Sequence, residues 1–172
     1  MAGCQIVYAR INTRKDGTIL DEFMIQTHDK SAAKEKETLF RIRKMIDDTL
    51  AGKFILKEQL SEKTKTISKR QKAMITAPRV SVINEMSKTH TVLEISGSDR
   101  PQLLYDVTRK IAQLGLQINS ASVSTYGDRA VDVFYVKDVF GLRVEHDGKI
   151  IQIKSALMEA IEPTTTTQDD KI

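Results

Sequence analysis

The sequence contains no tryptophan, a single cysteine and only three prolines among 172 residues. Phe and Tyr together supply 5% of the chain, so a core must rest on aliphatic side chains. One thiol excludes a disulfide framework and a Cys-x-x-Cys metal site, which fits a reducing compartment. No apolar run reaches the 18 or so residues of a membrane span. These absences predict a soluble, cytoplasmic protein with no membrane partner.

Positive charge is concentrated in one segment. The formal net charge is +4, and residues 53–72 hold seven basic against two acidic residues, a local +5. A surface that binds nucleic acid carries basic residues along a folded face, interleaved with aromatic residues. We therefore interpret this segment as a solvated linker and expect no nucleic-acid partner. A nucleic-acid-binding segment is the alternative.

An internal repeat organises the chain. Residues 3–13 read GCQIVYARINT and residues 115–125 read GLQINSASVST, with five identities at an offset of 112. One residue fewer in the following turn moves the offset to 111, at which residues 20–25 match residues 131–136. Matches in two strand-length blocks identify two copies of one unit.

Each copy has the pattern of a β-hairpin followed by a helix. The hairpin turns are expected at Tyr126–Arg129 and at Arg14–Gly17, where Asp-Gly favours a tight turn. Apolar residues then recur at helical spacing, which predicts one helix ending near Gly52 and another ending at Pro163. These residues are Leu39, Ile42, Ile46 and Leu50 in the first copy and Ile150, Ile153, Leu157 and Ile161 in the second.

The second copy also has a strand and a helix ahead of its hairpin. Residues 91–95 read as the strand, and an apolar stripe over residues 103–114 predicts the helix. The unit order is therefore β-α-β-β-α, and the first copy lacks about 25 residues upstream. We interpret Met1 as an internal or mis-assigned start, or as a boundary; the alternative is a short protein whose hairpin pairs with another chain. Residues 79–84 form a further β-like run that fits either unit.

The loop at residues 96–104 joins that strand to that helix. Asp99 is a good N-cap, Gln102 has the spacing of a capping box, and Pro101 suits a first helical turn. These residues therefore predict a helix start. Backbone N–H groups at a helix N-terminus also favour a carboxylate, so the loop is a candidate site for an amino acid.

Residues 98–142, SDRPQLLYDVTRKIAQLGLQINSASVSTYGDRAVDVFYVKDVFGL, resemble an ACT domain, a small regulatory module with the order βαββαβ. They are most similar to the last ACT domain of the bifunctional uridylyltransferase and uridylyl-removing enzymes, which modify the PII nitrogen-signal protein. ARINTRKDGTILDEFMIQ resembles the second half of the penultimate ACT domain of that family, and RVSVINEMSKTHTVLEI fits the segment between the two. The resemblance covers residues 3–162.

The resemblance implies an α+β, ferredoxin-like pair of ACT units. Residues 1–56 would form the C-terminal part of the first unit, residues 57–78 a basic linker and residues 79–163 the second unit. Residues 79–84 would be an extra or exchanged strand, and residues 164–172 a flexible tail. ACT units would pair with one another within or between chains.

The resemblance also implies a glutamine sensor for nitrogen control, with PII as a partner of the parent enzyme. By position, the ligand-binding residues would be Asp99, Arg100, Pro101, Gln102, Leu103, Leu104, Gln117, Ile118 and Asn119. ACT domains often carry Gly directly after the Pro, whereas this chain has Gln102, whose side chain could crowd the site or supply contacts. A stand-alone ACT-type module for small-molecule binding or protein interaction is the alternative.

The sequence predicts no catalytic residue and no metal ligand in this chain. The adjacent carboxylates Asp47 and Asp48 lie on a predicted helix, where neighbours in sequence do not share a face. His28 and Asp29 read as a polar loop, and the other histidines are isolated. No cofactor is expected here, because Mg²⁺ would serve only a nucleotidyltransferase domain outside this chain.

Overall fold

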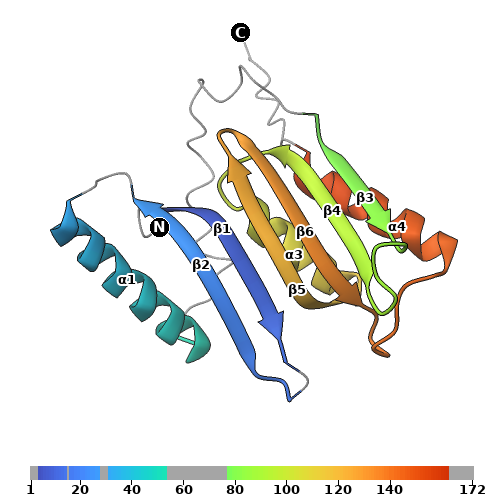
Figure 1. The fold of residues 1–172 in the computed structure, drawn as a ribbon, viewed down its shortest axis with the longest axis horizontal. Coiled ribbons are helices and arrows are strands. Elements are labelled where there is room, and N and C mark those ends of the chain that lie inside the picture. The colour runs from blue at the N-terminus through green and yellow to red at the C-terminus, as the bar shows by residue number, and fades with distance from the viewer. Residues whose placement is uncertain (1–3, 15, 28–30, 54–76, 163–172) are drawn as a thin grey trace, which may run out of the picture.

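The computed structural model describes residues 4–14, 16–27, 31–53 and 77–162, which form one antiparallel sheet of six strands and three helices (Figure 1). The strand order is β2-β1-β5-β6-β4-β3. This arrangement confirms the predicted α+β, ferredoxin-like class. Residues 57–76 of the predicted linker and residues 164–172 of the predicted tail lie outside the described residues. The elements are β1 (Cys4–Thr13), β2 (Ile19–Thr27), α1 (Ala32–Leu50), β3 (Arg79–Ile83), β4 (Thr91–Ser98), α3 (Leu103–Gln113), β5 (Gln117–Tyr126), β6 (Arg129–Lys137) and α4 (Asp147–Ile161).

Both predicted hairpins form. A two-residue turn at Gly127 and Asp128 joins β5 to β6. In the turn between β1 and β2, the N–H of Thr18 donates a hydrogen bond to Asp16 Oδ1 at 3.0 Å. Gly17 in the same turn has a φ of +83°, which a residue without Cβ adopts without steric cost. Both residues of the Asp-Gly pair therefore stabilise this turn.

The second unit is a complete four-stranded module. Its strands have the order β5-β6-β4-β3, and α3 and α4 cover one face of the sheet (Figure 1). In a βαββαβ module, the place beside the first strand belongs to a strand that follows the second helix. Here β3, which precedes β4 in sequence, pairs with it antiparallel at that place. Residues 79–83 therefore belong spatially to the second unit.

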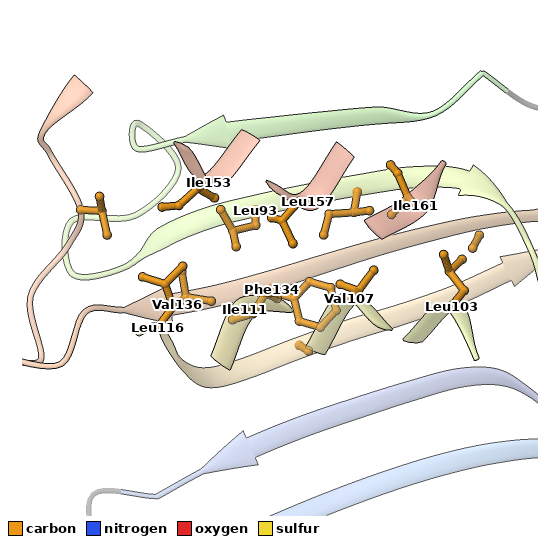
Figure 2. Close-up of a cluster of buried hydrophobic side chains, with 14 residues drawn as sticks. Leu93, Leu103, Val107, Ile111, Leu116, Phe134, Val136, Ile153, Leu157 and Ile161 are labelled. Carbon is orange, nitrogen blue, oxygen red and sulfur yellow. The ribbon is translucent and has the colours of Figure 1, made fainter. Parts of the chain in front are cut away.

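The core of the second unit lies between its sheet and its two helices (Figure 2). Alternate residues of β6 point into this core because strand side chains alternate between faces. The apolar stripe of each helix faces them. The largest fully buried side chains of this core are Phe134, Leu93, Ile111, Ile153, Leu157, Val107 and Val136.

The two units join through strands β1 and β5, whose pairing follows the internal repeat. Ala9 lies opposite Val123, and Ile11 lies opposite Ala121. The repeat offset of 112 relates Ala9 to Ala121 and Ile11 to Val123, so the two pairs are equivalent. The same offset relates Arg10 to Ser122, and these two residues pair with each other between the two equivalent pairs. A pseudo-twofold axis therefore passes between these two residues, as in the isologous interface of a symmetric dimer. The two hairpins are confirmed as copies of one module.

Residues that build the core of the second unit have exposed counterparts in the first. Phe134 is fully buried, but its counterpart Phe23 is 47% exposed. The offset of 111 extends into the helices: Leu157 of α4 is fully buried, while its counterpart Ile46 of α1 is 50% exposed. In the second unit, β4 pairs with β6 beside Phe134, and α3 packs against α4. No counterpart of β4 or α3 exists among the described residues, so the first unit presents an open apolar face.

Candidate effector site

The connection between β4 and α3 is fixed to the neighbouring hairpin and to α4. The N–H of Asp99 donates to the carbonyl of Asp128 in the β5–β6 turn at 2.8 Å. Arg100 turns toward the helices instead, where its Nη1 forms an ion pair with Asp106 at 2.7 Å. Its Nη2 donates to the carbonyl of Ala160 at 2.8 Å. Arg100 therefore joins the first turn of α3 to the last turn of α4.

The predicted capping box is wrong. The residue that precedes α3 is Gln102, whose φ of 71° is left-handed and whose side chain makes no cap hydrogen bond. A residue in this conformation cannot continue a right-handed helix, so α3 begins only at Leu103. Asp99 and Pro101 consequently lie in the loop. Glycine, which has no Cβ, would adopt this conformation without steric cost.

The conformation of Gln102 gives a direct stability prediction. A left-handed φ costs a residue with a Cβ roughly 1 kcal/mol relative to glycine. We expect Gln102→Gly to be more stable than Gln102→Ala by about that amount, since both variants lack the Gln side chain. Urea denaturation of the two variants measures the difference. Equal free energies of unfolding would show that residue 102 is not held at positive φ.

The predicted strand residues lie far from the loop within the second unit. Gln117 pairs with Lys137, whereas Ser98, the last residue before the loop, pairs with Arg129. Eight residues of β6 separate these two partners, which corresponds to about 26 Å along a strand. Residues 99–104, which comprise the loop and the first two residues of α3, are therefore not brought together with strand residues 117–119 in one unit.

The pseudo-twofold axis places another strand end near the loop. Ile6 and Val7 of β1 are the repeat counterparts of Ile118 and Asn119. They lie at the loop's end of the sheet, where Thr125 Oγ1 donates to the carbonyl of Ile6 at 3.4 Å. Figure 1 shows the first residues of β1 at the same end of the sheet as the β4–α3 connection. The loop and the start of β1 therefore lie at the same end of the sheet, with the β5–β6 hairpin between them.

Residues 117–119 occupy the symmetric position. They start β5 at the end of the sheet that also carries the β1–β2 turn, because Asn12 pairs with Ser120. The side-chain oxygen of Asn119 is buried there without a hydrogen-bond partner. By the pseudo-twofold relation, the corresponding loop would belong to the first unit, and it has no counterpart among the described residues.

Sequence reasoning missed Asp132, a buried carboxylate in the second unit. It lies on β6 with 2% of its surface exposed. Burial raises the pKa of its carboxyl group to about 7; a hydrogen bond from the backbone of Ser124 lowers it, and the nearby charge of Asp99 raises it. The sequence signal for Asp132 was that the repeat aligns it with another aspartate, Asp21. That match alone did not show which face of the strand Asp132 occupies.

The described residues hold no cluster of three or more His, Cys, Asp or Glu side chains arranged as a metal site. Asp48 pairs with Lys53 at 3.1 Å on the surface of α1. His28 and Asp29 lie outside the part of the chain that the structure describes. No helix in the described ranges is long and apolar enough to cross a membrane.

The fold defines a tandem ferredoxin-like α+β module whose two units share one sheet. A family model for the ACR9-like, ACT-like domain matches residues 79–164, from the start of β3 to just beyond α4. The chain therefore belongs to the ACT-like domain family.

The chain is also similar to the bifunctional uridylyltransferase/uridylyl-removing enzymes of three bacteria. It is 45% identical to that of Rhodospirillum rubrum over 95% of this chain, and 44% identical to that of Azospirillum brasilense over 93%. It is 36% identical to that of Gluconobacter oxydans over 96%. The chain spans only 17–18% of the length of these relatives. No solved structure matches it.

Proposed function

We propose that this chain is the glutamine-responsive region of a PII uridylyltransferase/uridylyl-removing enzyme in the cytoplasm. The similarity over 95% of the chain to one such enzyme supports the parent assignment. The observation that carries the regulatory role is the pseudo-twofold pairing of β1 with β5, which joins two ACT-like units into one sheet. Uridylyl transfer to PII, its reversal and the Mg²⁺ they need would belong to other parts of the parent.

We place the effector between the loop at residues 99–104 and the first residues of β1. The start of α3 offers backbone N–H groups for the carboxylate of an amino acid, a favourable interaction at a helix N-terminus. Ile6 and Val7 supply the facing wall from the other unit. Residues 117–119 would form the wall of the symmetric half-site, which a loop of the first unit would complete.

An effector at this position contacts both units and therefore favours one packing of the pair. Allosteric coupling of this kind is worth about 1–3 kcal/mol between sites. The loop itself is tied to the β5–β6 turn through Asp99 and to α4 through the neighbouring Arg100. A shift of the loop on binding would consequently move the end of α4, which leads out of the second unit.

Titration calorimetry with glutamine tests this function, with glutamate and asparagine as matched controls. Glutamate has the shape of glutamine with a carboxylate in place of the side-chain amide, and asparagine is one methylene shorter. We expect saturable heat for glutamine and at least tenfold weaker binding of both controls, as for a site that hydrogen-bonds the amide. Indistinguishable heats for the three ligands would contradict the proposal.

The open apolar face of the first unit favours a second candidate, a stand-alone ACT-type module that binds a protein partner. Phe23 of β2 and Ile46 and Leu50 of α1 are all about half exposed or more, and exposed apolar surface that forms a contiguous patch marks an interaction site. Reading the coding DNA upstream of Met1 distinguishes the two candidates. An in-frame strand, helix and catalytic region supports the first, and a nearby stop codon supports the second.

A further inference from the structure

The helix-covered face of the sheet contains one polar position in each of two symmetric rows. In the first row, successive residues lie directly opposite one another across all six strands: Phe23, Ala9, Val123, Asp132, Ile95 and Val80. The second row consists of Asp21, Ile11, Ala121, Phe134, Leu93 and Val82. The pseudo-twofold axis exchanges Asp132 with Asp21. The repeat therefore carries a carboxylate at the same core-facing position in both units.

Among the described residues, no positively charged group compensates the carboxylate of Asp132. Its Oδ1 atom is buried and has no hydrogen-bond partner in that part of the chain. Its neighbours on β4 and β5 are Ile95 and Val123, and the charged group that affects it from the loop is Asp99, which is also acidic. The guanidinium of Arg100 is engaged with Asp106 and the end of α4. Burying a carboxylate without a cation or a full set of donors is costly.

The position of Asp132 relates it to the effector loop. Ala130, two residues earlier on the same face of β6, pairs with Gly97 at the end of β4. Asp132 thus lies opposite Ile95 of β4, and Asp99 in the loop is close enough to raise its pKa. The carboxylates of Asp99 and Asp132 are therefore close to each other, and the loop that carries Asp99 leads to the start of α3, where N–H groups have the opposite polarity.

We propose that Asp132 receives the cationic amine of the amino-acid effector, an assignment that deepens the proposed function and rests on it. The α-ammonium group supplies both the positive charge and the hydrogen-bond donors that this carboxylate lacks. The effector carboxylate then faces the N–H groups at the start of α3. Because only 2% of Asp132 is exposed and Asp99 of the loop lies close to it, the amine reaches it only when the loop moves aside. Binding and loop displacement are therefore one event, as regulation requires.

A cycle of two proteins and two ligands tests this assignment by calorimetry on the full chain. The ligands are glutamine and glutaramic acid, which is glutamine without its α-amine, and the variant is Asp132→Asn. We expect the variant to bind glutamine about 10- to 100-fold more weakly, the range for loss of a charged hydrogen bond. Its affinity for glutaramic acid should stay within about threefold of the wild-type value. Asp21→Asn, at the exposed counterpart position, is the matched control and should bind both ligands as the wild type does.

The pH dependence gives a second readout. The wild-type affinity for glutamine should rise between pH 6 and pH 8 as Asp132 loses its proton, and that of Asp132→Asn should not. Equal weakening of both ligands in the variant would show that Asp132 only supports the fold and would overturn the assignment. Unchanged glutamine binding in the variant would overturn it as well, while leaving the sensor intact. A wild-type chain that binds no glutamine would overturn the proposed function together with this assignment.

Discussion

Replacing Phe134 with Ala should lower the free energy of unfolding by about 3–5 kcal/mol, the range for removing a fully buried Phe. The same substitution at its counterpart, Phe23→Ala, should cost less than about 1 kcal/mol, because surface changes are usually small. The two residues occupy equivalent positions of one repeated module, but 0% of Phe134 and 47% of Phe23 is exposed. Urea denaturation followed by circular dichroism measures both values.

The contrast between these variants tests the asymmetry of the two units. Phe134 packs beneath α3 and α4 in the second unit (Figure 2). Comparable losses at the two positions would mean that the first unit buries Phe23 in solution, for example against a second copy of the chain. Repeating the Phe23→Ala measurement across a tenfold range of protein concentration identifies that case.

Replacing Asp132 with Asn should stabilise the chain at pH 8 by up to roughly 4 kcal/mol and have little effect near pH 4. The pKa of this carboxyl group is about 7 in the folded chain, against an ordinary value of 3.8. Between these two values the folded state holds a proton that the unfolded state has released, so wild-type stability falls as pH rises from about 4 to about 7. Above pH 7 the carboxylate is ionised in both states and the loss is complete. Asn cannot ionise, so the variant avoids that loss.

Asp21→Asn is the control for this pH series. Asp21 occupies the symmetric position but is exposed, so its substitution makes the same chemical change outside the core. Thermal unfolding from pH 4 to pH 8 compares the three proteins. Parallel profiles for the wild type and Asp132→Asn would show that Asp132 ionises in the folded chain as readily as a surface carboxylate.

The elements of this fold follow from local patterns in the sequence. Helical spacing of Ile153 and Leu157 predicts α4, and both residues are buried as expected. Gly52, the predicted stop of the first helix, has a left-handed φ of 71° directly after α1. The repeat predicts that the hairpins are equivalent, and the register of β1 with β5 confirms it. Such features depend on neighbours in sequence, which is why sequence alone reveals them.

Other features depend on contacts that no local pattern specifies. The left-handed conformation of Gln102 could not be expected from a residue with a Cβ, and the capping-box prediction failed there. The β-like run at residues 79–84 fits either unit in sequence, and tertiary contacts place β3 beside β4. The separation of the loop from residues 117–119 emerges only from strand register, as does the burial of Asp132 between Val123 and Ile95.

The most direct test of the account is an NMR titration of the isotope-labelled chain with glutamine. If the effector lies between the two units, backbone amide signals of residues 99, 100 and 102–104 should shift together with those of Ile6 and Val7, at one common affinity. Signals of residues 117–119, at the other end of the sheet, should change little. Shifts confined to residues 117–119, or a loop that responds while β1 does not, would contradict an effector site shared by the two units.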